Sequence, residues 1–238
     1  MKYYFLSDAL EFPDLEHADS DGLLAIGGDL KPERILLAYT SGIFPWYNED
    51  QPILWWSPNP RFVLFPEKIK VSKSMRQVLR KGIFKVTFDT DFEGVITACQ
   101  QVKREGQQGT WITQEMLQAY LRLHHLGWAH SVEVWHQGEL CGGLYGLSIG
   151  KCFFGESMFS RQSNASKAGF VTLVNELQKA DFQLIDCQVH TEHLESLGAE
   201  LIPRKQFLQH LASSVNTTTP TDFRLFKTNF FNGNSLGK

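Results

Sequence analysis

The sequence has no long apolar run and no large excess of charge of one sign. None of its apolar stretches is long enough to span a bilayer, so we expect no contact with a membrane. The formal net charge of −3 over 238 residues argues against a protein that binds nucleic acid with its whole surface. One basic face remains compatible with that charge, because net charge averages over the surface. Residues Met1–Phe5 are followed at once by Asp8 and Glu11, which is not the pattern of a secretory leader, and a cytoplasmic protein is expected.

The sequence also lacks a paired cysteine motif. Its four cysteines are scattered, with no CxxC spacing, at Cys99, Cys141, Cys152 and Cys187. Three of them fall in predicted strands, which favours buried thiols in a reducing compartment over disulfides or a metal site. The glycine pair Gly27-Gly28 lacks the Lys-Ser/Thr ending of a phosphate loop, so a nucleotide-binding loop is not expected there.

Residues 132–189 carry the clearest pattern. They predict a hairpin, a third strand, a helix and a fourth strand, at residues 132–135, 140–149, 152–159, 166–180 and 184–189. Three polar residues interrupt the apolar strands, namely Glu156, Asp186 and Gln188. Side chains alternate along a strand, so Asp186 and Gln188 should share one face. A buried carboxylate is costly unless it is paired or used, and these residues therefore mark a candidate site.

Positive charge is concentrated between residues 68 and 85. This basic run consists of Lys68, Lys70, Lys73, Arg76, Arg80, Lys81 and Lys85. Ser72 is a plausible N-cap, and residues 73, 76 and 80 have the spacing of one helix face. Two interpretations stay open: a solvated helix face, or a surface that binds a phosphate backbone.

Three tryptophans, Trp46, Trp55 and Trp56, lie close together among prolines. They either cap a core or form a wall that stacks on a base or an apolar side chain. Further along, the order of strands and helices suggests an acetyltransferase-like α+β fold. The junction Arg161–Ser166 has Asn164 and Ser166 where that superfamily carries the glycines that bind coenzyme A, so the fold is expected without its usual cofactor.

Several runs together resemble one family, the bacterial leucyl/phenylalanyl-tRNA–protein transferases. The runs lie in one order between about residue 20 and about residue 210, at Gly22–Leu30, Gly42–Trp46, Leu54–Pro58, Gly109–Thr113, Gly155–Ser160, Asn164–Lys167 and Leu184–Val189. The resemblance implies transfer of Leu or Phe, with Met considered as a third donor, from aminoacyl-tRNA to the α-amine of proteins that begin with Arg or Lys. The product is a signal for degradation by the N-degron pathway.

The resemblance also implies the architecture and the reactants. The expected fold class is α+β, with a small N-terminal domain (residues 1–62) and an acetyltransferase-like (GNAT/Fem-like) C-terminal domain (residues 63–238) whose mixed sheet is flanked by helices. An aminoacyl ester is an activated acyl donor, so no cofactor or metal is expected. A monomer is expected, with aminoacyl-tRNA and the acceptor protein as its partners.

By resemblance, Asp186 orients Gln188, Gln188 contacts the reacting groups, and Glu156 holds an ammonium group of the donor or the acceptor. The predicted substrate-binding residues are Trp46, Trp111, Leu144, Phe153, Ser157, Phe170, Leu173 and Ile185. Relatives are expected to have Met at position 144 and Phe at position 173. A relay through Asp186 and Gln188, proton transfer by the tRNA's own ribose hydroxyl, and a purely structural Asp186–Gln188 pair all stay open.

Two other functions remain possible on the residues alone. A coenzyme-A-dependent N-acetyltransferase fits the fold but not the glycine-poor junction at Asn164–Ser166. An RNA-binding module would use the basic run and the tryptophans, but it gives Glu156, Asp186 and Gln188 no role.

Overall fold

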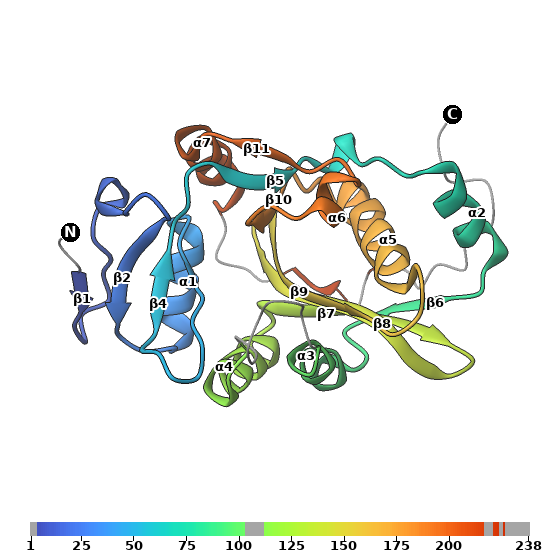
Figure 1. Ribbon diagram of the computed structural model, residues 1–238, viewed down its shortest axis with the longest axis horizontal. Coiled ribbons are helices and arrows are strands. Elements are labelled where there is room, and N and C mark those ends of the chain that lie inside the picture. The colour runs from blue at the N-terminus through green and yellow to red at the C-terminus, as the bar shows by residue number, and fades with distance from the viewer. Residues whose placement is uncertain (1–3, 103–111, 217–220, 224–225, 227–238) are drawn as a thin grey trace.

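The computed structural model describes residues 4–102, 112–216, 221–223 and 226, which fold around two sheets (Figure 1). The smaller sheet has the strand order β1-β2-β4-β3. Its strands are β1 (Tyr4–Leu6), β2 (Leu23–Gly27), β3 (Phe44–Pro45) and β4 (Leu54–Trp56). Between β2 and β3 lies helix α1 (Pro32–Thr40), which begins at Pro32 because the fixed φ of proline suits the first helical position.

The larger sheet has seven strands in the order β11-β5-β10-β9-β8-β7-β6. The strands are β5 (Arg61–Leu64), β6 (Lys85–Phe88), β7 (Ala129–His136), β8 (Glu139–Ile149), β9 (Cys152–Ser160), β10 (Leu184–Gln188) and β11 (Glu200–Ile202). The helices between and after them are α2 (Lys73–Lys81), α3 (Phe92–Gln100), α4 (Gln114–His125), α5 (Ala165–Lys179), α6 (Glu192–Glu195) and α7 (Arg204–Ser214). β9 and β10 are parallel and the other pairs are antiparallel, so the predicted α+β class with a mixed sheet flanked by helices is confirmed.

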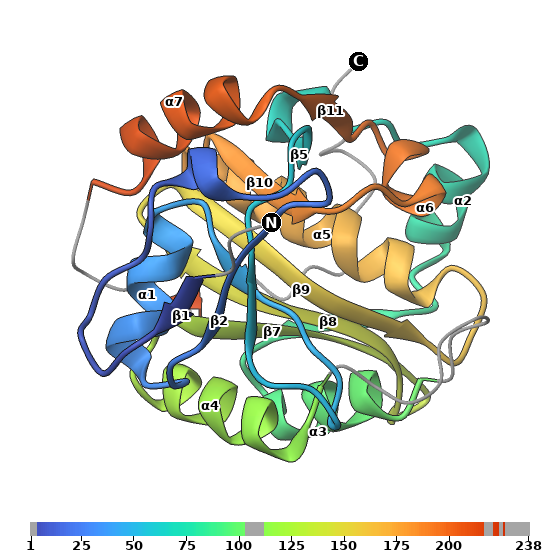
Figure 2. The same ribbon diagram turned by 60° about the vertical axis from the view of Figure 1, so that its left-hand side comes forward.

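Helices cover both faces of the larger sheet. Figure 2 shows α3 and α4 on one face and α5 with α6 on the other. Alternate strand residues point to the two faces, as the pleat requires. Tyr145 and Phe154 join the apolar cluster of α1, α3 and α4, whereas Leu144 and Phe153 join the cluster of α2 and α5. The smaller sheet packs into the first cluster through the fully buried Trp55, so the two sheets share a core.

Local signals explain where the elements begin and turn. Gln137 and Gly138 both have positive φ, 53° and 87°, which is the backbone of the tight turn predicted between β7 and β8. Helices α2 and α4 each begin with a side-chain cap, and the one predicted at Ser72 is confirmed. The Ser72 hydroxyl accepts from Met75 N at 3.1 Å at the start of α2, and the Thr113 hydroxyl accepts from Met116 N at 3.1 Å at the start of α4.

The strand pairing around β9 and β10 is irregular at three places. β10 pairs with β9 only from Leu184 to Asp186. The pairing of β8 with β9 shifts register around Glu156, and that of β10 with β5 shifts register between Asp186 and Gln188. Bulges of this kind re-aim side chains and are common beside active sites. The simple alternation from which we expected Asp186 and Gln188 to share a face is therefore interrupted between them.

The expected domain boundary, between residues 62 and 63, falls inside β5. All four residues of this strand, Arg61–Leu64, pair within the larger sheet, so a division at the start of β5 follows the sheets more closely. The division into two domains stays a prediction. Among the described residues, no helix combines the length and apolar character that a membrane span requires.

Candidate active site

A cavity of about 430 Å³ lies where β9 and β10 diverge. Side chains of β8, β9, β10 and α5 form its apolar part, namely Leu144, Phe153, Phe170 and Ile185. Its polar part is formed by Glu156 and Gln188, and residues around α6, including Thr191 and His193, complete the wall. A site of this composition suits a small apolar group attached to a polar, reactive one.

The structure gathers most of the predicted substrate-binding residues around this cavity. Leu144, Phe153, Phe170 and Ile185 line it, and Ser157 does so too. Leu173 is fully buried in the same apolar cluster but does not line the cavity. Trp46 is 37% exposed, packs against Trp56 with ring centroids 5.7 Å apart, and is likewise outside the lining. Trp111 lies outside the described residues.

The back of the cavity is supported by a residue near the C-terminus. This residue, Phe223, is fully buried. Its ring stacks on His130 with centroids 3.9 Å apart, and on Phe153 with centroids 5.9 Å apart. Phe226 packs against Phe223 at 4.4 Å. Phe223 therefore lies directly behind an aromatic wall of the cavity.

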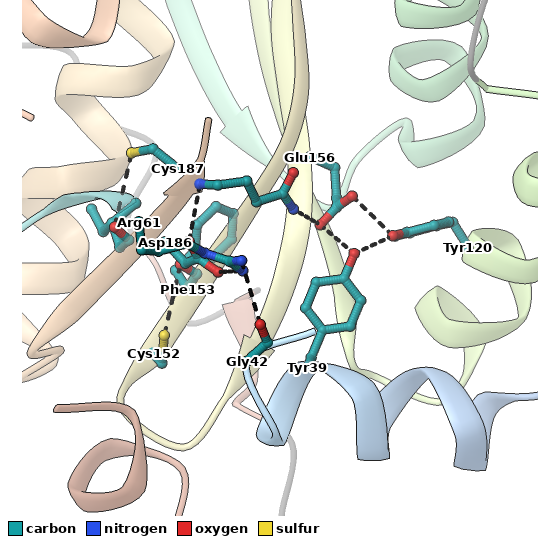
Figure 3. A network of polar contacts seen from close by, with 11 residues as sticks. Tyr39, Gly42, Arg61, Tyr120, Cys152, Phe153, Glu156, Asp186 and Cys187 are labelled. Carbon is teal, nitrogen blue, oxygen red and sulfur yellow. Dashed lines mark hydrogen bonds and ion pairs between the residues drawn. The ribbon is translucent and has the colours of Figure 1, made fainter. Parts of the chain in front are cut away.

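Glu156 accepts three hydrogen bonds from three different elements (Figure 3). Its Oε1 accepts from the Tyr39 hydroxyl at 2.7 Å and from Gln188 Nε2 at 2.9 Å, and its Oε2 accepts from the Tyr120 hydroxyl at 2.9 Å. Removal from bulk water raises the pKa of Glu156 to about 7; the hydrogen bonds from both phenols oppose this shift, and the negative charge of Asp186 adds to it. The carboxyl group therefore titrates near neutral pH.

Gln188 is held in an uncommon backbone conformation. Its φ is +63°, and Val189 N donates to Cys187 O at 2.8 Å, which closes a three-residue turn around Gln188. A left-handed backbone is unfavourable for a residue with a side chain, so surrounding contacts must hold it. One such contact is the hydrogen bond from Gln188 N to Asp186 Oδ1, at 2.9 Å. This turn directs the amide side chain to Glu156.

Asp186 is fully buried and paired with the equally buried Arg61. Arg61 Nε donates to Oδ1 at 2.8 Å and Nη2 donates to Oδ2 at 2.6 Å, which is the bidentate geometry of a strong ion pair. The guanidinium lies over the rings of Phe44 and Phe207, 4.6 and 4.7 Å from their centroids. Asp186 does not line the cavity, and its link to the cavity wall is the hydrogen bond that it accepts from Gln188 N.

Comparison with known proteins identifies the family of this chain. Residues 63–212 match the family model of leucyl/phenylalanyl-tRNA protein transferase, and residues 28–59 match the model of its N-terminal domain. The chain belongs to the leucyl/phenylalanyl-tRNA protein transferase family. The resemblance predicted from the sequence is thus confirmed, and with it the assignment as an aminoacyltransferase.

Individual relatives cover almost the whole chain. The leucyl/phenylalanyl-tRNA–protein transferase of Myxococcus xanthus (strain DK1622) is 56% identical over 221 residues, which are 92% of this chain and 94% of that protein. The one of Pseudomonas putida (strain W619) is 56% identical over 226 residues, 94% of this chain and 100% of that protein. Among solved structures, a GCN5-related N-acetyltransferase-like protein from Streptococcus suis 89/1591 superposes on 71% of this chain and 62% of its own. Its TM-score of 0.35 and identity of 15% are too low to support any argument.

Sequence reasoning missed three side chains of this transferase site. Tyr39 and Tyr120 fit the apolar periodicity of their helices, so their hydroxyls gave no separate signal. Arg61 opens a strand beside two prolines and gave no sign of a partner 125 positions away. A buried Asp186 in an apolar strand required a cation, but the sequence offered no means to choose it.

The basic run of this transferase lies mostly on its surface. Lys70, Lys73, Arg76, Arg80, Lys81 and Lys85 are exposed, and those of α2 lie opposite the buried Met75 and Leu79. Lys68 is exposed too, but it pairs with Glu200 and lies over the ring of Phe65. Among the described residues no ion pair compensates the charge on α2, whereas Lys68 is paired with Glu200.

Proposed function

We propose that this protein transfers Leu or Phe from aminoacyl-tRNA to the α-amine of proteins beginning with Arg or Lys, as a cytoplasmic monomer without a cofactor. The product would enter the N-degron pathway. One observation carries the proposal: an apolar cavity ends at a carboxyl–amide pair, Glu156 and Gln188, held by hydrogen bonds from separate elements. This is the arrangement expected for a site that binds an aminoacyl ester, with an apolar side chain at one end and a polar ester at the other.

The apolar part of the cavity would take the side chain of the donor amino acid. Its wall of Leu144, Phe153, Phe170 and Ile185 offers no charged group, so apolar donors are favoured over polar ones. A single methylene in such a pocket changes selectivity by roughly 1–3 kcal/mol, so the balance between Leu and Phe depends on the exact volume of the pocket. Leu173, one layer behind, would set the volume indirectly. Trp46 and Trp111 are the candidates to contact the terminal adenosine of the tRNA.

The polar part would position the reacting groups. In the reaction the acceptor nitrogen attacks the ester carbonyl, the bond to the ribose oxygen breaks, and the proton of the amine ends on that oxygen. We propose that Glu156 binds the ammonium group of the donor or the acceptor. Gln188 would contact the reacting atoms. Asp186 serves as a positioning residue, because Arg61 and Gln188 N occupy its oxygens. That arrangement favours proton transfer within the substrates over a relay through Asp186.

The exposed face of α2 would bind the tRNA. Lys73, Arg76 and Arg80 have the spacing of one face, and contacts of this kind recognise the phosphate backbone rather than the base sequence. Identity of the tRNA should then matter less than the attached amino acid.

The alternative of a coenzyme-A-dependent acetyltransferase is disfavoured by the start of α5. Asn164 adopts φ +69°, as a glycine would, but two of the following amides are already used. Ala165 N donates to Gln162 O at 3.0 Å, and Ser166 N donates to Ser160 Oγ at 3.4 Å. Fewer amides therefore remain for a pyrophosphate at this helix N-terminus.

A transfer assay tests the proposal. Labelled Phe-tRNA and an Arg-initiated peptide should give Phe-Arg-peptide, whereas an Ala-initiated peptide should stay unlabelled. Equal labelling of both peptides would contradict the acceptor specificity, and saturable binding of acetyl-CoA would favour the acetyltransferase. The Gln188→Ala variant should lose turnover and keep its affinity for tRNA, which separates an enzyme from an RNA-binding module.

A further inference from the structure

Three oxygen–oxygen contacts form a closed ring beside the cavity (Figure 3). The hydroxyls of Tyr39 and Tyr120 are 2.6 Å apart, and they lie 2.7 and 2.9 Å from the two oxygens of Glu156. Each contact requires one hydrogen, and each phenol brings one. Two hydrogens cannot fill three contacts, so an ionised Glu156 leaves one pair of oxygens facing each other without a hydrogen.

A proton on the Glu156 carboxyl supplies the third hydrogen. We propose that Glu156 is protonated in the empty site and releases this proton when the cationic amine of a substrate binds there. The identity of that amine rests on the proposed function; the proton itself does not. The charge balances, because the arriving ammonium replaces the proton as the positive partner of the carboxylate and the proton passes to the solvent.

The groups around Glu156 support a neutral carboxyl. Tyr39 from α1 and Tyr120 from α4 are both fully buried, and burial raises the pKa of each phenol well above its usual range, so both stay protonated. The negative charge of Asp186 on β10 also favours a neutral Glu156. Arg61 does not offset this effect by pairing with Glu156, because it donates to Asp186 and to Gly42 O. Among the described residues, no ion pair gives Glu156 a cationic partner.

The same sheet contains a carboxylate of the opposite kind. Glu133 on β7 is fully buried and accepts from the hydroxyls of Thr87 at 2.6 Å and Ser131 at 2.5 Å. It also accepts from the backbone amides of Thr90 and Asp91, each at 3.3 Å. Its four donors need no further hydrogen, and backbone amides cannot turn into acceptors. Glu133 is therefore a matched control for Glu156.

Glutamine mimics a protonated carboxyl, so the two positions should respond differently. We expect Glu156→Gln to keep the ring and Glu133→Gln to lower the unfolding midpoint at pH 7. At position 133 the amide nitrogen would face the Thr87 hydroxyl, which then loses the acceptor for its hydrogen and already accepts from Trp135 Nε1. Because the folded pKa of Glu156 exceeds the unfolded one, its stabilisation is present at low pH and disappears as pH rises to about 7. The folding constant of the wild type relative to Glu156→Gln should then fall roughly tenfold per unit between about pH 4.5 and 7. A ratio that does not change with pH would overturn the proposal.

Proton release is measured by calorimetry on the full chain. The probe is adenosine carrying phenylalanine in amide linkage at its 3′ position, titrated at pH 6 in buffers of different ionisation enthalpy. We expect close to one proton released per bound probe for the wild type and none for Glu156→Gln. Binding of the probe without proton release would overturn the coupling. Failure of the probe to bind would count against the proposed function as well, whereas the unfolding comparison reports on the proton alone.

Discussion

Replacing Arg61 by Met tests whether the charge of Asp186 is structural. The variant keeps an apolar side chain between Phe44 and Phe207 but removes both hydrogen bonds to the buried carboxylate. Breaking a buried ion pair in this way costs about 3–5 kcal/mol, because the remaining charge is left without a partner. A domain is stable by only about 5–15 kcal/mol, so Arg61→Met should unfold at a much lower denaturant concentration.

The double variant Arg61→Met, Asp186→Leu separates stability from activity. With both charges gone, a well-packed apolar pair should recover most of the lost free energy of unfolding. Transfer activity should stay low, because Gln188 N no longer has the Asp186 oxygen that holds its left-handed turn. Urea unfolding with equal m-values and single-turnover transfer measure the two quantities. A cost below about 1 kcal/mol for Arg61→Met, or a double variant no more stable than the single one, would refute the reasoning.

Three further changes probe the amide, the basic face and the back wall. Gln188→Asn accepts the left-handed backbone but is one methylene too short to reach the carboxyl group, so we expect a near-normal unfolding midpoint and roughly 10²-fold slower single-turnover transfer. Affinity for tRNA should fall steeply with salt, and Arg76→Ala with Arg80→Ala should reduce the salt slope by roughly 1 per lost contact, measured by filter binding; a flat response would remove α2 from the interface. Phe223→Ala should cost about 3–5 kcal/mol in urea unfolding and shift donor choice toward bulkier side chains, whereas Phe226→Ala should leave donor choice unchanged.

Local signals explain why so much of the fold could be predicted. The Gln137-Gly138 turn, the caps at Ser72 and Thr113 and the apolar alternation of the strands act over a few residues, so a reader of the sequence can find them. The same holds for Glu156 and Gln188, which stand out as polar residues in apolar strands.

Long-range partners explain why the rest could not be predicted. Arg61 meets Asp186, and Tyr39 meets Glu156, only after the two sheets have packed together. The register shift between Asp186 and Gln188 depends on how β10 pairs with β5. The alternation of side chains along a strand therefore cannot predict it. The burial of Phe223 has the same cause, since its neighbours His130 and Phe153 are distant in sequence.

The carboxyl group of Glu156 joins two halves of the molecule that are far apart along the chain. Tyr39 reaches it from α1, beside the smaller sheet, and Tyr120 reaches it from α4, beneath the larger one. Without the packing of α1 against the larger sheet, Glu156 would lose one of its three hydrogen-bond partners. A substitution in α1 that displaces Tyr39 should therefore disturb Glu156 although α1 lies outside the cavity wall.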